Sequence, residues 1–229
     1  MMKSELFVSD PNRDMIISFM TIRKAVGWLG IGLPVVLYLG TLLIGHCGIL
    51  KASISDYFYT NMGSVFTGIL CAVALFLFTY KGPAPVDGIL SSLAGVFALG
   101  VAFFPCNISA GHFECDIICR PPNGLRNLVH YCSAAAFFIV LATMSIWLFR
   151  KSNKPNPGIR KRSRNAVYFV CGIVILAAMG LILSIKVFHL GEKLYCLRPT
   201  FWLELIALWA FGISWLVKGE LVLGDVPEN

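Results

Sequence analysis

The chain has 229 residues, of which 57% are hydrophobic and only 14% are charged, whereas a soluble domain carries about 25% charged residues. The hydrophobic residues fall in long uninterrupted runs, so lipid must be the solvent for most of the surface, and a water-soluble globular protein is excluded. The net charge of +7 has a meaning only through its distribution along the chain.

Residues 1–24 precede the first apolar run and contain Glu5, Asp10 and Asp14. No pattern of small residues closes that run, which indicates a retained span and not a cleaved signal peptide. Asp10 followed by Pro11 is typical of a helix start, with Asp as the N-cap and Pro at the first helical position. The sequence therefore predicts a cytoplasmic N-terminal segment with a short interfacial helix that leads into the first span.

Six apolar stretches are each about 17 to 25 residues long, the length that crosses roughly 30 Å of hydrocarbon at 1.5 Å per residue. Each should be a helix, because backbone groups cannot stay unpaired in lipid and nothing alternates with the period of a barrel strand. The predicted fold is an all-α polytopic membrane protein with a six-transmembrane-helix bundle over residues 25–217 and a cytoplasmic tail over 218–229. The six spans are placed at 25–45, 63–80, 88–105, 128–149, 166–190 and 201–217.

The Lys and Arg residues orient these spans, because they are retained on the cytoplasmic side. Thirteen of the 19 lie in the N-terminal segment, the 81–87 turn, the 150–165 loop and the tail, and the 150–165 loop alone holds seven. Both termini are therefore expected in the cytoplasm. A basic loop between two spans has this topological explanation, so no nucleic-acid partner is expected.

Small residues recur at intervals of four in two spans. Ala94, Ala98 and Ala102 lie in the third span, and Gly180 and Ser184 lie in the fifth. This spacing lets helix backbones approach closely, so both stripes are predicted to be packing seams.

The first loop on the outer side reads SISDYFYTN over residues 53–61. One interpretation is an aromatic belt at the membrane surface, which Tyr57 and its neighbours would suit. The other is a polar lip over a pocket, in which Ser53, Ser55, Asp56 and Tyr57 form hydrogen bonds with a ligand. Both interpretations stay open, because an aromatic belt at the membrane surface does not require an aspartate.

Five cysteines lie on the outer side: Cys47, Cys106, Cys115, Cys119 and Cys196. Thiols in exposed loops pair in an oxidising compartment, so at least one disulfide is expected. We predict that it joins Cys196 to one of Cys106, Cys115 and Cys119, and that Cys47 stays unpaired.

His112 with Cys115 and Cys119 could instead form a metal site, since these are ligand types at short spacing. Disulfides fit the compartment better and no CxxC is present, so no metal is predicted. The sequence also has no nucleotide-binding loop. We therefore expect no cofactor.

His130 and Glu204 lie about one turn inside the fourth and sixth spans. Ionisable groups below the membrane surface are costly and often functional, although shallow ones can also reach the headgroups. We predict that these two side chains face each other and form one polar site with residues 53–60.

Several segments resemble a family of bacterial polytopic membrane proteins known as a domain of unknown function. They include IRKAVGWLGIGLP (22–34), SISDYFYT (53–60), VHYCSAAAFFIVLATMSIWLF (129–149) and FWLELIALWAFGISWLVKGE (201–220), and the resemblance covers nearly the whole chain. The layout is more distantly similar to the Frag, DRAM and Sfk type of six-span protein. The resemblance implies a six-span protein of the bacterial inner membrane and no particular reaction. Where relatives are expected to carry an Arg-Asp pair, this chain has Gly63-Ser64.

Three functions remain open. The first is a protein that binds or moves a lipid head group or small amphiphile in an outward-facing pocket formed by Asp56, His130 and Glu204. The second is an intramembrane lipid hydrolase or transferase that uses His130 and Glu204 as an acid-base pair. The third is a structural or assembly protein. Membrane lipids are the expected partners, and a homo-oligomer stays open.

Overall fold

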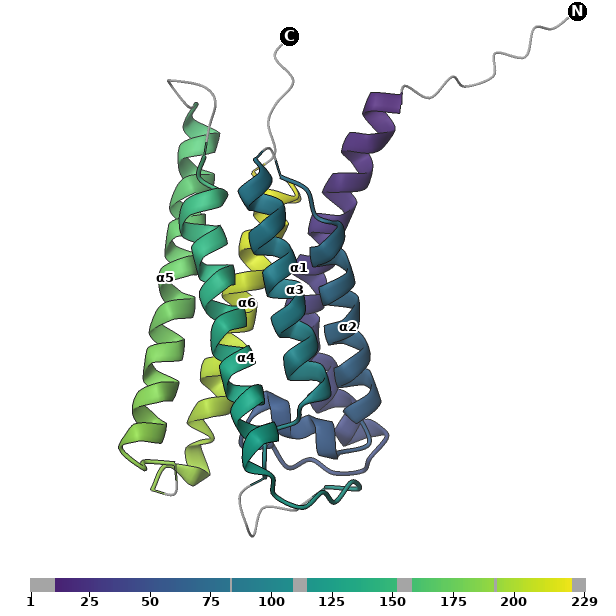
Figure 1. The fold of residues 1–229 in the computed structure, drawn as a ribbon, viewed down its shortest axis with the longest axis vertical. Helices are drawn as coiled ribbons and strands as arrows, with labels where there is room; N and C mark the ends of the chain where they lie inside the picture. Colours follow the sequence, from purple (N-terminus) through teal and green to yellow (C-terminus); the bar gives the residue numbers. More distant parts are fainter. Residues whose placement is uncertain (1–10, 83, 109–114, 152–157, 192, 224–229) are drawn as a thin grey trace, which may run out of the picture.

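The computed structural model describes residues 11–82, 84–108, 115–151, 158–191 and 193–223, with no strand among them. The chain runs up and down through six long helices (Figure 1). Three short helical segments lie between them along the chain. These elements are α1 (Pro11–Leu43), η1 (Ile54–Tyr59), α2 (Gly63–Thr79), α3 (Pro85–Phe103), α4 (Gly124–Thr143), η2 (Met144–Leu148), α5 (Ile159–Val187), η3 (Tyr195–Leu197) and α6 (Pro199–Lys218).

The helices form a closed ring. Each helix packs against the next one along the chain, and α6 packs against α1. One end of the ring, here called the terminal end, is where α1 begins and α6 ends. The opposite end, here called the loop end, carries η1 and the described parts of the connections that follow α3 and α5 (Figure 1).

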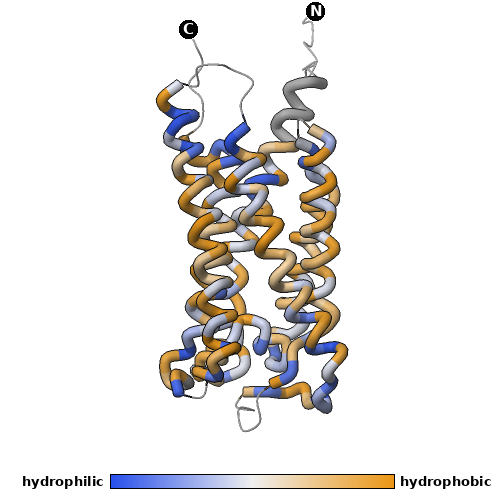
Figure 2. Tube along the Cα trace, turned by 60° about the vertical axis from the view of Figure 1, so that its left-hand side comes forward, coloured by the Kyte–Doolittle hydropathy of each residue, from blue (hydrophilic) through white to orange (hydrophobic). Residues whose placement is uncertain are grey.

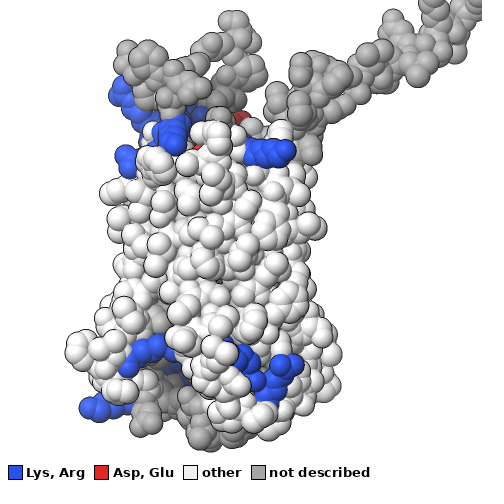
Figure 3. All heavy atoms as spheres, viewed as in Figure 1, with Lys and Arg blue, Asp and Glu red and all other residues white. Residues whose placement is uncertain are grey.

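Five helices are long and apolar enough to cross a membrane, and α2, with 17 residues, is a shorter apolar helix. Hydrophobic residues dominate the middle of the bundle and hydrophilic ones gather at both ends (Figure 2). On the face shown in Figure 3, Lys and Arg also lie only at the two ends and leave a broad uncharged band between them. The chain is therefore a multi-pass membrane protein by the length, composition and arrangement of its helices.

Local sequence explains where several helices begin. Pro85 and Pro199 stand at the first turns of α3 and α6, where the missing N–H of proline has no intrahelical partner to lose. The Asn123 side chain caps α4 by accepting a hydrogen bond from the Arg126 amide at 2.9 Å. The predicted interfacial helix is not a separate element, since α1 runs without interruption from Pro11 through Pro34.

Small residues set the closest helix contacts. A Cβ atom built on Gly212 of α6 would lie 2.6 Å from the Gly27 carbonyl oxygen of α1, so only glycine permits this crossing. Ala94, Ala98 and Ala102 of α3 are fully buried, which confirms the seam predicted in the third span.

The terminal half of the core is filled by aromatic rings that surround Trp215, namely Tyr80, Phe149 and Phe211.

Candidate functional site

The first connection folds beneath the bundle because Ser53 caps η1. Ser53 has an extended backbone, and its Oγ accepts a hydrogen bond from the Ser55 amide at 3.1 Å. The same hydroxyl donates to the Glu204 carboxylate of α6, 2.8 Å from Oε2, and the Ile54 amide donates to Oε2 at 2.6 Å. Glu204 therefore points into the bundle and fixes the start of η1 against α6.

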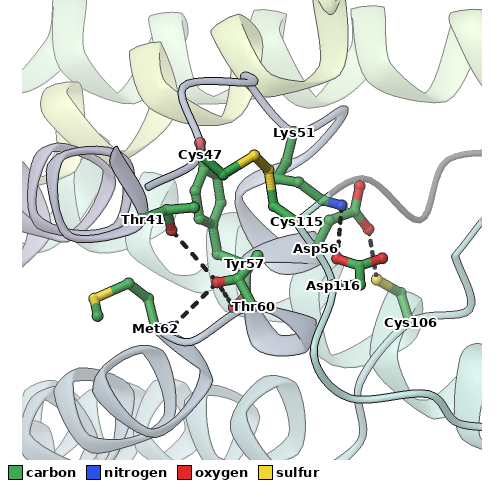
Figure 4. A network of polar contacts seen from close by, with 10 residues as sticks. All are labelled: Thr41, Cys47, Lys51, Asp56, Tyr57, Thr60, Met62, Cys106, Cys115 and Asp116. Atoms are coloured by element: carbon green, nitrogen blue, oxygen red, sulfur yellow. Dashed lines mark hydrogen bonds and ion pairs between the residues drawn. A yellow bond between two sulfur atoms is a disulfide. The ribbon is translucent and has the colours of Figure 1, made fainter. Parts of the chain in front are cut away.

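A clamp holds the loop that follows α3 against this first connection (Figure 4). Cys47 and Cys115 form a disulfide. Next to it, Lys51 Nζ lies 2.7 Å from Asp116 Oδ1, and both side chains are about 95% buried, with 4% and 5% exposed. Two backbone amides of the same loop donate to the Tyr59 carbonyl. The clamp thus places residues 51–56 between α6 and the 115–118 segment.

Asp56 lies beside the clamp and is buried. The Cys106 thiol donates to its Oδ1 at 3.4 Å (Figure 4). Burial raises the pKa of the Asp56 carboxyl and raises the pKa of the Cys106 thiol well above its ordinary value. Cys106 is therefore a protonated hydrogen-bond donor and not a nucleophile, because the reactive form of cysteine is the thiolate.

His130 is buried on the first turns of α4, and its Nδ1 lies 2.8 Å from the Phe104 carbonyl oxygen. A carbonyl oxygen can only accept, so Nδ1 carries the hydrogen. This bond ties the end of α3 to α4. The carboxylate of Glu204 is bonded to Ser53 and Ile54 and not to His130, so the predicted direct pairing of these two residues is not seen.

Both residues nevertheless line one cavity of about 470 Å³. It lies at the loop end among α4, α5, α6, the 52–56 segment and the start of the 104–123 connection. Its polar end is formed by Ser53, Asp56, Cys106, Asn107, His130, Lys186, Thr200 and Glu204. Its longer, apolar part is formed by Ala134, Ala135, Phe138 and Ile139 of α4 and by Leu176, Met179, Gly180, Ile182 and Leu183 of α5.

The cavity reaches the flank of the bundle between α4 and α5. Three of its lining side chains, Ile139, Leu176 and Leu183, are more than 40% exposed on the surface that faces away from the core. Gly180 is also exposed, and a Cβ atom there would contact nothing within 4 Å. The seam predicted at Gly180 in the fifth span is therefore wrong, since this small residue widens the opening and packs against no helix.

Lys186 marks the rim of the polar end. Its Nζ lies 3.3 Å from the centroid of the Tyr131 ring. This cation–π contact joins α5 to α4 at the edge of the cavity. Lys186 is exposed, so its ammonium group stands where the cavity meets the surroundings.

The six residues predicted to bind a ligand divide into two groups. Ser53, Asp56, His130 and Glu204 line the cavity together, although they come from η1 and its N-cap, α4 and α6. Ser55 lies in a separate cavity of about 50 Å³ that also touches Glu204. Tyr57 is fully buried, and its ring packs against Phe201. Because it is fully buried, Tyr57 is not a belt residue, and it does not line the cavity.

The predicted disulfide connectivity is wrong, although the expectation of a disulfide holds. Cys47 was expected to stay unpaired, yet it bonds to Cys115 with a Cα–Cα distance of 5.9 Å. The first connection turns beneath the bundle directly after α1, which brings Cys47 to the loop that follows α3. Cys119 and Cys196 are free and exposed, and Cys106 is free and buried.

No three His, Cys, Asp and Glu side chains in the described part of the chain gather closely enough to hold a metal ion. His112, one of the ligands considered for a metal site, lies outside the described residues.

Comparisons of this chain with protein-family models, with curated proteins and with solved structures found no match. The geometry of the cavity is therefore the basis for any functional argument.

Sequence reasoning missed the apolar part of the cavity and four of its polar residues, Cys106, Asn107, Lys186 and Thr200. Cys106 had been interpreted only as a disulfide candidate, and the other three residues were assigned to no ligand-binding site. Their positions in the chain give no sign of this role, because Cys106 meets Asp56, and Lys186 comes to line the same cavity, only after the ring of helices closes.

Proposed function

We propose that this protein spans a bacterial inner membrane six times, with the terminal end in the cytoplasm and the loop end outside. The proposal rests on the excess of basic residues at the terminal end and on the length of α2. Its 17 residues extend about 26 Å, which suffices for a thin or locally adapted bilayer.

This topology has a direct test, because Cys119 and Cys196 are free and exposed at the loop end. A membrane-impermeant maleimide added to whole cells should label both. Labelling that appears only after the membrane is permeabilised would reverse the orientation.

We propose that the protein binds an amphiphile, with its polar group at the loop end of the cavity and its apolar chain between α4 and α5. The observation that carries this proposal is the cavity itself, which joins a polar end to an apolar flank that opens toward lipid. Its volume of about 470 Å³ lies within the roughly 300–1,000 Å³ of small-molecule sites. An apolar chain would replace lipid contacts in the opening while buried donors and acceptors hold the polar group.

Two glycines offer a matched test. Gly180 lines the cavity, whereas Gly68 of α2 is exposed elsewhere, and a Cβ atom on either would contact nothing within 4 Å. Leucine at Gly180 should fill the opening, while leucine at Gly68 should leave the cavity unchanged. Both helices should tolerate leucine, which has a better helix propensity than glycine.

The measurement is native mass spectrometry of the full chain purified in mild detergent. The wild type and Gly68→Leu should retain a lipid-sized adduct, and Gly180→Leu should lose it. Equal retention by all three proteins, or no adduct on any of them, would contradict binding in this cavity and leave a structural or assembly role.

The alternative of a lipid hydrolase or transferase has less support from the geometry. An acid-base pair of His130 and Glu204 should share a hydrogen bond or one substrate proton. Here Ser53 and Ile54 donate to Glu204, and Nδ1 of His130 donates to a backbone carbonyl.

A further inference from the structure

The charged groups around the polar end of the cavity are unbalanced. Asp56 and Glu204 contribute two carboxylates from η1 and α6, and Lys186 contributes one ammonium group from α5. The neighbouring Lys51 and Asp116 form an ion pair with each other and add no net charge. Apart from His130, the lining of the polar end therefore has one more acidic than basic side chain.

Lys51 attracts Asp56 and Lys186 attracts Glu204 from a distance, but neither carboxylate forms a close ion pair with a residue of the described part of the chain. The nearest close ion pair joins Lys51 to Asp116, and another joins Arg164 to Glu220. Glu204 receives hydrogen bonds from neutral donors, the Ser53 hydroxyl and the Ile54 amide. Asp56 receives one from the Cys106 thiol, which is a weak donor.

A buried carboxylate without a counter-charge is costly. The raised pKa of Asp56 reports this cost, because burial disfavours its ionised form. A cationic ligand would supply the missing charge and would gain charge-assisted hydrogen bonds, which are about twice as strong as neutral ones.

We propose, on the basis of the amphiphile-binding function above, that the ligand carries a primary ammonium group which binds between Asp56 and Glu204. Its anionic phosphate then lies toward Lys186 at the rim. The class of ligand is a zwitterionic aminophospholipid of the phosphatidylethanolamine type. A primary ammonium group has three N–H donors for the two carboxylates, whereas a choline group has none.

The arrangement of the rim agrees with this order of groups. Lys186 lies over the Tyr131 ring at the edge of the cavity, while Asp56 and Glu204 lie deeper and are better buried than the exposed lysine. A head group that enters with its ammonium group first would therefore meet the carboxylates, and the phosphate that follows would meet the lysine.

The experiment presents the delipidated full chain with dioleoyl phosphatidylethanolamine, phosphatidylcholine and phosphatidylglycerol, each alone and at equal concentration. Native mass spectrometry measures the bound fraction. The ethanolamine lipid should bind with an affinity about tenfold or more higher than that of the other two lipids. One charge-assisted hydrogen bond accounts for a difference of this size. Asp56→Asn and Glu204→Gln should each reduce this preference.

Asp87→Asn is the matched control for the two acid variants. Asp87 is a buried aspartate of α3, with 4% of its surface exposed, but it lies at the terminal end and does not line the cavity. This variant should keep the full preference for the ethanolamine lipid.

The outcomes separate this inference from the function on which it rests. Equal binding of all three lipids that Gly180→Leu abolishes would overturn the ammonium site and leave amphiphile binding intact. Binding that Gly180→Leu does not change would overturn both. A preference that survives both acid variants would also overturn the ammonium site.

Discussion

Removing one partner of the ion pair between Lys51 and Asp116 should be one of the most destabilising single changes at the loop end. Its charged atoms lie 2.7 Å apart, with side chains only 4% and 5% exposed. At an effective dielectric constant of about 20, two unit charges at this distance attract each other by about 6 kcal/mol, much of which offsets the loss of hydration. Removing one partner leaves the other charge buried, which costs about 3–5 kcal/mol.

The perturbation is a double-mutant cycle of Lys51→Met, Asp116→Leu and the double variant. Each single change should lower the midpoint of thermal unfolding in detergent by about 6–20 °C, at about 2–4 °C per kcal/mol for a chain of this size. The double variant should be more stable than either single variant, because it leaves no unpaired charge.

The ion pair between Arg164 and Glu220 provides the control. Arg164 and Glu220 lie 3.6 Å apart, and the Glu220 side chain is 36% exposed, so Glu220→Gln should cost less than about 1 kcal/mol. A loss of stability in Asp116→Leu no larger than that in Glu220→Gln would contradict a costly unpaired charge. A loss in the double variant equal to the sum of the losses in the two single variants would contradict it too.

Three further predictions follow from the fold. Cys47→Ser or Cys115→Ser should lower stability by at most about 4 kcal/mol, the chain-entropy value for a sequence separation of 68, and unreduced peptide mapping should show this pair linked. Burial raises the pKa of Asp56, so the folded state binds more protons than the unfolded state, and stability should fall as pH rises from the ordinary Asp pKa of 3.8 through the raised pKa. Thermal unfolding of the delipidated protein across pH measures this fall. Asp56→Asn should remove it and should be more stable than the wild type at pH 7. Gly212→Leu should destabilise by about 1–3 kcal/mol or more, since its Cβ would lie 2.6 Å from a carbonyl oxygen of α1, whereas Gly32→Leu, which contacts nothing, should leave the unfolding temperature unchanged.

The helical architecture could be predicted because hydrophobic length and backbone hydrogen bonding leave few options in lipid. Each predicted span overlaps one long helix, closely at residues 63–80 for α2 (Gly63–Thr79) and less closely at 25–45 for α1 (Pro11–Leu43). The inward direction of Glu204 also follows from the cost of a charge that faces lipid.

The partners of these groups could not be predicted, because they depend on distances that arise only in three dimensions. Glu204 binds Ser53 and Ile54, about 150 positions earlier in the chain. Cys47 was assigned to the end of the first span, and nothing in its neighbours indicates that the chain turns beneath the bundle toward Cys115. Gly180 shows the same limit, since a small residue on a helix predicts a packing seam and an open cavity equally well.

The central claim is that an apolar chain occupies the space between α4 and α5. The most direct measurement is photo-crosslinking of the full chain in membranes with a fatty acid that carries a diazirine on its chain, followed by peptide mass spectrometry. The account predicts crosslinks concentrated at residues 134–139 and 176–183, with Gly180→Leu reducing them and Gly68→Leu not. Crosslinks spread evenly over the lipid-facing sides of all the long helices, α2 included, would contradict it.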